Sequence, residues 1–234
     1  RVPEAESTET AVLYTIAYAD IFDYALTLEQ IHRYLIGCRA SLSEVAAALG
    51  KAPALSQAGP YYHLTGRDSL LELRRQRAET SARAWPRALR YGAMIAQVPF
   101  VRMVALTGAL AMDNARDGDD IDYLIVTERD RLWLSRAMVI ALVVRPGSLR
   151  GDEVCPNYFV TSSNLDFDDH DLFTAHELAQ MVPLFGRGVY DDMRRANPWV
   201  CRFLPNASGA PSGVDVRVQV TARWLSQSVV EPVL

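Results

Sequence analysis

Two acidic residues stand two positions apart near the middle of the chain, Asp120 and Asp122 in the run DIDYLIVT. The apolar and β-branched residues that follow predict a strand, and side chains two positions apart in a strand point to the same face. Two carboxylates on one face repel each other, so a strand that keeps both is expected to give them a cation. The spacing therefore predicts a divalent metal site at the start of this strand.

A second strand and a tight turn precede the acidic pair. The run MVAL at 103–106 predicts the strand, and Thr107, Gly108 and Ala109 follow it as a turn of small residues. Glycine lets the backbone approach a bound group closely. The residues 103–127 thus combine an acidic pair with a turn of small residues.

This arrangement resembles the DNA polymerase beta-like nucleotidyltransferase superfamily. Members of that superfamily have a hydrophobic-Gly-Gly/Ser turn followed, some ten residues later, by a strand that opens with Asp-hydrophobic-Asp or Asp-hydrophobic-Glu. Here residues 106–109 match the turn, and Asp120 and Asp122 match the strand. The resemblance covers roughly residues 98–165, and the order of domains is also similar to that of uncharacterised bacterial nucleotidyltransferase-domain proteins.

The resemblance implies an activity and a set of residues. It implies a Mg²⁺-dependent enzyme that transfers NMP from an NTP, such as ATP, to a hydroxyl acceptor. Asp120 and Asp122 would be the catalytic metal ligands, and Thr107, Gly108 and Ala109 would bind the nucleotide. The metal ions would bridge triphosphate oxygens and stabilise the attacking and leaving oxygens.

Two positions depart from the family pattern. Ala109 stands where many relatives have Ser, so one hydroxyl contact to a phosphate is missing. Asn157 stands where a third carboxylate is expected, on the strand after the next helix; its carbonyl can ligate a metal, but an amide cannot act as a general base. Asp152 and Asp166 are the candidate substitutes. The departures leave a second interpretation open, a non-catalytic, nucleotide-sensing regulator with a degenerate transferase fold and a DNA- or protein-binding winged helix.

The elements that must position these residues fall into three segments. Residues 1–67 predict a winged helix-turn-helix domain, with helices at about 10–24, 28–36 and 42–49 and a strand and turn at 61–66. Capping boxes at Thr27–Gln30 and Ser41–Glu44 mark the starts of the second and third helices. The third helix contains no Arg, Lys, Asn or Gln to contact bases or phosphates, although Arg33, Arg39 and Arg67 flank it. A protein partner is therefore favoured over DNA at this domain.

Residues 68–97 predict a connecting helix that Pro86 ends or kinks near Trp85. Residues 98–234 predict a second domain with strands on either side of the turn, a helix to Val144 stopped by Arg145-Pro146-Gly147, and a strand at 154–161. Helices at about 172–182, 189–196 and 215–230 follow, with an irregular segment at 197–213. The predicted fold class is α+β, a nucleotidyltransferase-like mixed sheet flanked by helices and preceded by a small winged-helix domain.

Composition excludes several other classes of protein. The chain has 234 residues, half of them hydrophobic, and a formal charge of −4, which argues against a general nucleic-acid coat protein. Three cysteines without a CxxC pair predict buried free thiols and no zinc site, and His176-Glu177 does not extend to the HExxH motif of zinc proteases. The longest apolar run is too short to span a bilayer and no signal peptide opens the chain, so a cytoplasmic protein without a membrane partner is expected.

Overall fold

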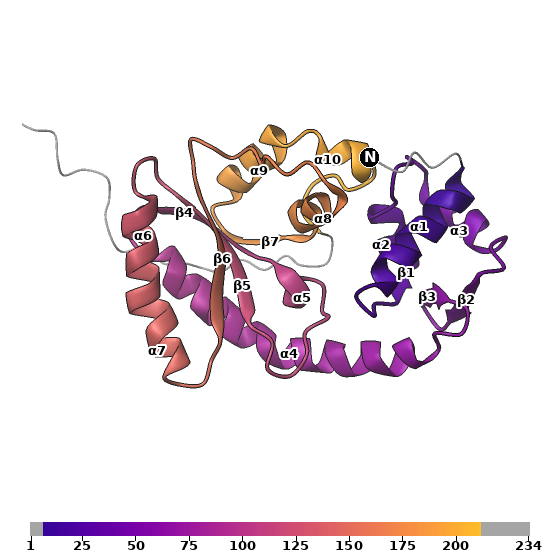
Figure 1. The fold of residues 1–234 in the computed structure, drawn as a ribbon, viewed down its shortest axis with the longest axis horizontal. Helices are drawn as coiled ribbons and strands as arrows, with labels where there is room; N and C mark the ends of the chain where they lie inside the picture. The colour runs from indigo at the N-terminus through magenta and orange to yellow at the C-terminus, as the bar shows by residue number, and fades with distance from the viewer. Residues whose placement is uncertain (1–6, 212–234) are drawn as a thin grey trace, which may run out of the picture.

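The computed structural model describes residues 7–211. Its smaller, N-terminal part, residues 7–67 (hereafter the N-terminal half), is a small bundle of helices with a three-stranded sheet (Figure 1). The helices are α1 (Thr8–Asp20), α2 (Leu28–Arg33) and α3 (Leu42–Leu49). The strands β1 (Leu26–Thr27), β2 (Leu55–Ala58) and β3 (Tyr61–Leu64) pair antiparallel in the order β1-β3-β2. A separate hydrophobic core holds this half together and includes Val12, Ile16, Ile31, Leu35 and Val45.

Local sequence signals explain the starts of two helices. In both predicted capping boxes the hydroxyl of Thr27 or Ser41 accepts from the N3 amide, while the N3 side chain accepts from the cap amide. These contacts satisfy amide donors that have no partner within the helix. Strands β1 and β2 were not predicted, because β1 is only two residues long and β2 lies in a segment rich in Ala, Ser and Gly.

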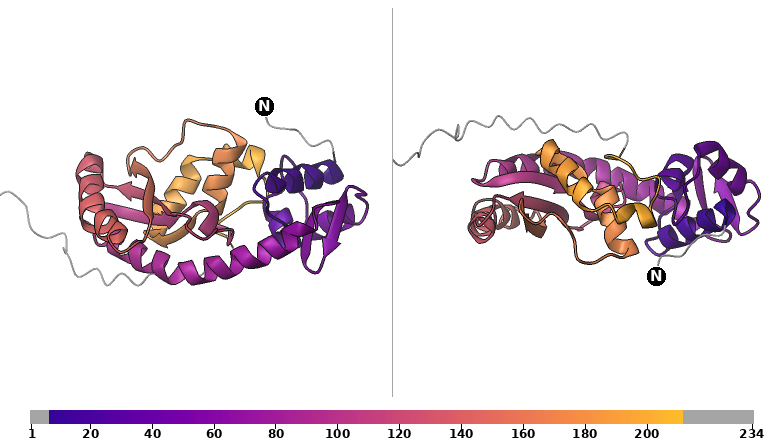
Figure 2. Two further views of the ribbon diagram at one scale, coloured as in Figure 1. Left: turned by 60° about the horizontal axis from the view of Figure 1, so that its bottom comes forward. Right: turned by 90° about the horizontal axis from the view of Figure 1, so that it is seen from above.

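Helix α4 (Ser69–Ala96) runs along one side of the molecule from the N-terminal half to the main sheet (Figures 1 and 2). The prediction that Pro86 would end or kink it near Trp85 is wrong as to the end, since the helix continues for ten residues beyond that proline. Packing overrides the cost of about 3 kcal/mol for an interior proline. Ala84, Ala88 and Tyr91 are buried against the sheet on both sides of the proline.

The main sheet is mixed and has four strands, β4 (Val101–Leu106), β5 (Ile121–Thr127), β6 (Val154–Thr161) and β7 (Val182–Phe185). Their order is β6-β5-β4-β7, with β5 and β6 parallel and the other pairs antiparallel. The predicted α+β class with a mixed sheet flanked by helices is confirmed. Strand β7 was missed because Pro183 favoured the end of a helix; β7 pairs only with β4, at the edge of the sheet, where a proline is tolerated.

Helices cover both faces of this sheet. One face packs on α4 and on the helical segment α6 (Leu132–Val139), η1 (Ile140–Val144) and α7 (Arg145–Ser148), and the other on α8 (Leu172–Gln180), α9 (Arg187–Ala196) and α10 (Val200–Phe203). Along β5, Tyr123 and Ile125 belong to the first core, whereas Leu124 and Val126 belong to the second. By this alternation Asp122 faces the layer that contains α8.

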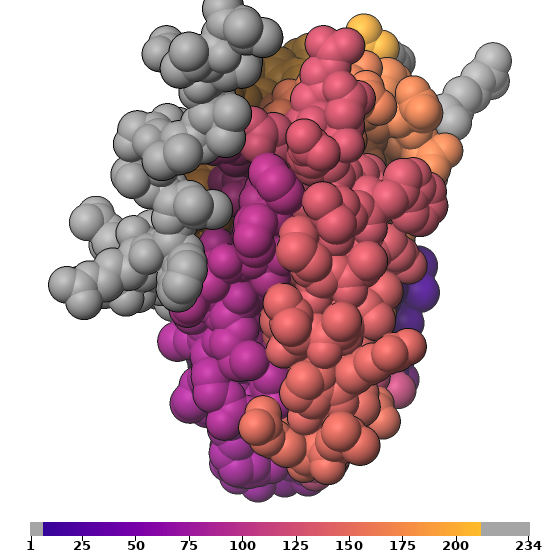
Figure 3. All heavy atoms as spheres, turned by 90° about the vertical axis from the view of Figure 1, so that its left-hand side faces the viewer, coloured from indigo at the N-terminus to yellow at the C-terminus, as the bar shows by residue number. Residues whose placement is uncertain are grey.

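The segment α6–η1–α7 lies at the surface beside α4 (Figure 3). The prediction that Arg145-Pro146-Gly147 stops the helix is wrong. The wide π turn of η1 comes first, so that Pro146 lies in the first turn of α7, where a missing amide costs least. Trp133, Leu142 and Leu149 on this segment are exposed. Within residues 7–211 no helix has the length and apolar character needed to cross a bilayer.

Three further predictions concern the C-terminal part of the chain and the cysteines. The segment predicted to be irregular after residue 196 contains the short helix α10, and the helix predicted at 215–230 lies outside the described residues. All three cysteines are free thiols, but they are not all buried as predicted, because Cys201 is exposed and the other two are partly exposed.

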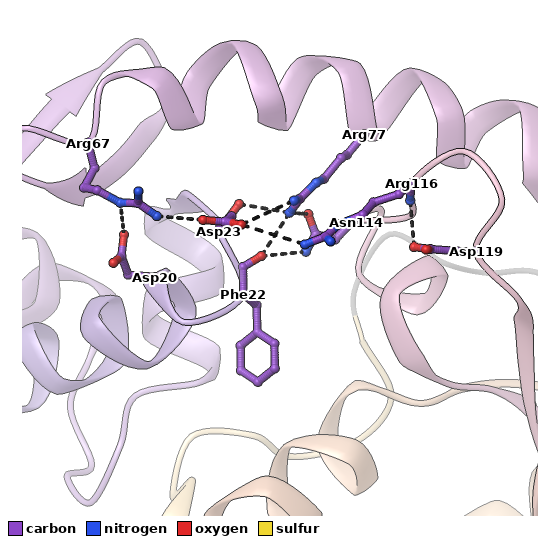
Figure 4. Close-up of polar contacts among 8 residues, drawn as sticks. All are labelled: Asp20, Phe22, Asp23, Arg67, Arg77, Asn114, Arg116 and Asp119. Atoms are coloured by element: carbon purple, nitrogen blue, oxygen red, sulfur yellow. Dashed lines mark hydrogen bonds and ion pairs between the residues drawn. The ribbon is translucent and has the colours of Figure 1, made fainter.

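Polar contacts join the two halves at the start of α4 (Figure 4). Arg67 donates to Asp20 at 2.8 Å and to Asp23 at 2.7 Å, within the N-terminal half. The buried Arg77 donates to the carbonyl oxygen of Phe22 at 2.9 Å and to Oδ1 of Asn114 at 3.0 Å. Arg77 thereby ties the loop after α1 to the loop that precedes β5.

The first prediction compares Arg77→Met with Arg75→Met on the same helix. Loss of the buried guanidinium leaves the Phe22 carbonyl and the Asn114 amide without this donor, so we expect a loss of about 2–4 kcal/mol in the free energy of unfolding. Arg75 pairs with Glu72 and Glu79 at the exposed surface, so its substitution should cost less than about 1 kcal/mol. Urea unfolding measures both variants, and equal losses would contradict the assignment of Arg77 as the tie.

Candidate functional site

A cavity of about 320 Å³ lies where the N-terminal half meets the main sheet. Its wall is formed by α1 and the loop after it, by the turn that follows β4, by the starts of β5 and β6, and by α8. The residues that face it are Thr15, Tyr18, Ala19, Phe22, Tyr24, Leu26, Tyr34, Gly108, Ala109, Met112, Asn114, Asp122, Asn157, Tyr158, Phe173, His176, Glu177 and Gln180. Four of the predicted site residues, Gly108, Ala109, Asp122 and Asn157, are therefore brought together here.

Gly108 makes room for the carboxylate of Asp122. Its φ of +66° lies in the left-handed region, and a Cβ atom at this position would overlap with Oδ2 of Asp122. The two residues are also joined through Thr107, whose backbone amide donates to the Asp122 carbonyl at 3.0 Å. Gly108 was expected to let a phosphate approach the backbone. In the structure, the side chain of Asp122 occupies the space that the glycine leaves.

The carboxyl group of Asp122 holds its proton more tightly than an ordinary aspartate. Burial raises its pKa, a hydrogen bond with Cys155 partly offsets this, and the charges of Asp120 and Asp119 raise it further. No Arg or Lys side chain forms an ion pair with Asp122 within residues 7–211. In this part of the chain, the hydrogen bond with Cys155 is the interaction that favours its charged form.

Glu177 on α8 is a second carboxylate in the same cavity. Burial raises its pKa to about 7, and the charge of Asp122 adds to that effect. A carboxylate with a pKa near neutrality that also faces another carboxylate is a typical feature of functional sites. Sequence reasoning considered Glu177 only as part of a failed zinc motif, because the packing of α8 against β5 has no local signal in the sequence.

His176 lies beside Glu177 and is an uncharged part of the wall. Its ring stacks on Tyr18 with centroids 4.3 Å apart, and its Nδ1–H donates to the carbonyl of Leu172 at 2.9 Å. Burial lowers its pKa to about 4, which keeps the ring neutral at physiological pH. Within the described residues no Arg or Lys lines the cavity, so the wall combines two acidic groups with neutral side chains, of which Tyr18, Phe22, Tyr24, Tyr34, Tyr158, Phe173 and His176 are aromatic.

The remaining predicted residues lie around this cavity. Thr107 is buried at the start of α5 (Gly108–Ala111), and its hydroxyl has no hydrogen-bond partner within the described part of the chain. Asp120 is exposed and lines a neighbouring hollow together with Glu153. Asp120 raises the pKa of Glu153 through a hydrogen bond between the two side chains and through its charge. Asp120 is nevertheless close enough for its charge to raise the pKa of Asp122.

Neither proposed substitute for a third carboxylate reaches the cavity. Asp152 lies before the start of β6, where it accepts from the Tyr91 hydroxyl at 2.6 Å and pairs with Arg87 and Arg90. Asp166 lies beyond the end of β6 and lines a separate hollow near Trp199. Asn157 faces the cavity but is exposed. Glu177 supplies the additional carboxylate, from a helix rather than from the strand where one was expected.

The second prediction concerns stability, since Asp122 and Glu177 repel each other in a desolvated site. Folded Glu177 keeps its proton up to about pH 7, whereas in the unfolded chain it loses it near 4.5, so stability falls as pH rises through this window. Glu177→Gln should therefore raise the free energy of unfolding by about 2 kcal/mol at pH 8 and change it little at pH 4.5.

Glu79→Gln on the exposed side of α4 is the matched control, and it should be close to neutral at both pH values. Urea unfolding of the three proteins at several pH values measures the difference in the free energy of unfolding between each variant and the wild type. His176 contributes equally in all three proteins, so its contribution cancels in this difference. A Glu177→Gln variant that is no more stable than the wild type at pH 8 would contradict the geometry described for the carboxylates.

The chain was compared with family models, curated proteins and solved structures. No family model matches it, and no curated protein or solved structure does. A function is therefore inferred from the chemistry of the cavity and of the residues around it.

Proposed function

We propose that the chain is a Mg²⁺-dependent nucleotidyltransferase that moves NMP from an NTP to a hydroxyl acceptor. One observation carries this proposal, the carboxylate of Asp122 placed against the Gly108 bend in a cavity that also contains Glu177. Nucleotidyl transfer depends on positioning and charge neutralisation, which carboxylate-bound metal ions supply, and on a group that accepts the acceptor's proton. The cavity offers side chains of both kinds.

The donor set fits Mg²⁺ in type and number. No group of three His, Cys, Asp or Glu side chains within residues 7–211 is arranged to hold a metal ion by itself. Mg²⁺ needs less, because it is usually held by one or two carboxylates together with substrate phosphates and waters. Asp122 would hold it from the cavity and Asp120 from the neighbouring hollow, and a cation would relieve the effect of Asp120's charge on Asp122. Bound there, it would supply positive charge to neutralise the negative charge that develops on the triphosphate.

Glu177 is the residue that supports a chemical step over mere binding. In the proposed reaction the acceptor oxygen bonds to the α-phosphorus, the bond to the β-phosphate oxygen breaks, and pyrophosphate leaves with the electron pair. The acceptor's proton passes to an Oε atom of Glu177, whose pKa of about 7 suits proton transfer at neutral pH. Asn157 has no such capacity, so the helix residue takes the role that the resemblance assigns to a later strand.

The N-terminal half is proposed to be a winged-helix module that serves as a wall of the active site. The arginines expected to face DNA are engaged elsewhere. Arg33 donates to the carbonyls of Ser208 at 3.0 Å and Gly209 at 2.7 Å, and Arg39 donates to Pro205 at 3.1 Å. Arg67 pairs with Asp20 and Asp23. These contacts favour the enzyme over the DNA-binding regulator.

The third prediction is that ATP and Mg²⁺ together raise the melting temperature by several degrees, about 5 °C at saturating ligand, and that Asp122→Asn abolishes the metal-dependent part. The amide keeps the shape of the side chain but removes the charge that attracts the metal. Differential scanning fluorimetry with each NTP, with and without Mg²⁺, measures the effect.

Asp130→Asn makes the same chemical change at an exposed turn at the far end of β5 and should leave the shift intact. A metal-dependent shift that survives in Asp122→Asn would remove Asp122 from the site. A wild-type protein that no NTP stabilises in the presence of Mg²⁺ would contradict the proposed function itself.

A further inference from the structure

Aromatic rings from both parts of the chain line the cavity. The N-terminal half supplies Tyr18, Phe22, Tyr24 and Tyr34, and the other half supplies Tyr158 and Phe173. Phe22 and Phe173 are 42% and 51% exposed, a large fraction for apolar side chains of this size. Aromatic rings that remain exposed in a cavity offer their faces to a ligand.

The position of Phe22 is fixed by its backbone. Its carbonyl oxygen accepts from Arg77 at 2.9 Å and from Asn114 at 3.3 Å, while its ring points away from these contacts (Figure 4). The neighbouring Asp23 has a φ of +52° and is held by Arg67. The loop after α1 is therefore held by three residues, Arg67, Arg77 and Asn114. These contacts fix the backbone from which the Phe22 ring extends to the cavity.

The charges of the cavity have one sign. Asp122 and Glu177 are acidic, His176 is neutral, and within the described residues neither Arg nor Lys faces the cavity. Two tyrosines of the wall sense the carboxylates, since the charge of Glu177 adds to burial in raising the pKa of Tyr18 and of Tyr158. The rings of Tyr24 and Tyr34 lie instead against Arg74 and Arg33, at 4.3 and 5.6 Å from the ring centroids, behind the wall. A ligand that brings a positive charge relieves this field, whereas an additional anion without a metal is repelled.

We infer that the cavity selects, as its acceptor, a hydroxyl-bearing organic ammonium ion with an apolar body. The apolar body lies against the aromatic rings, and the ammonium group is attracted by the ring faces and by the carboxylates. The role of the hydroxyl rests on the proposed nucleotidyl transfer, whereas the preference for a cation with an apolar body rests on the wall alone.

The test uses two probes of the same shape, 2-phenylethylamine, which is an ammonium ion at pH 7.5, and the neutral 2-phenylethanol. Titration calorimetry on the full chain, without NTP and without Mg²⁺, gives the affinity of each. We expect the ammonium probe to bind at least about tenfold more tightly, and Glu177→Gln to reduce that ratio to about threefold or less. Phe22→Leu should weaken the ammonium probe about fivefold, because it removes the ring face but keeps the apolar bulk.

Tyr14→Leu removes an exposed aromatic ring from the same helix as Tyr18, outside the cavity, and should leave both affinities unchanged. The inference is overturned if the two probes bind equally, if Glu177→Gln leaves the ratio intact, or if neither probe binds. Urea unfolding confirms that each variant is folded. Because the assay contains no nucleotide and no metal, its failure is distinct from a failure of the ATP and Mg²⁺ experiment.

Discussion

The repulsion between two carboxylates in one desolvated cavity is the interaction on which the rest of this structure's chemistry depends. Asp122 and Glu177 come from a strand and a helix far apart in the sequence, and the charge of Asp122 raises the pKa of Glu177 beyond what burial alone does. Such a pair destabilises the fold when both groups are ionised. Since no Arg or Lys within residues 7–211 lines this cavity, the proposed function assigns the compensating charge to an external cation, either a metal ion or an ammonium group.

The N-terminal half gives this site its second wall. Arg33 bonds it to the carbonyls of Ser208 and Gly209, and Arg77 of α4 bonds its loop at Phe22 to Asn114. These bonds fix rings from α1 and its following loop against the cavity. In the function proposed above, this module supplies specificity for a small ligand, while the sheet supplies the reactive groups.

Much of the architecture was predictable from local signals. The capping boxes at Thr27 and Ser41 gave the starts of two helices, and the β-branched runs gave β4, β5 and β6. The spacing between Gly108 and Asp122 predicted that the turn and the acidic residue belong to one site. Elements whose formation depends on tertiary contacts were missed. β7 forms at Pro183 because β4 offers an edge, and α4 continues through Pro86 because the sheet packs against both sides of it.

The position of Glu177 could not be predicted for the same reason. A lone glutamate in a helix is usually solvated, and only the docking of α8 beside β5 buries it next to Asp122. The most direct measurement is the titration of Glu177 by NMR of its labelled side-chain carboxyl carbon. We expect a midpoint near pH 7 that falls when Asp122 is replaced by Asn. A midpoint near 4.5 that does not respond to that substitution would contradict the proximity of the two carboxylates.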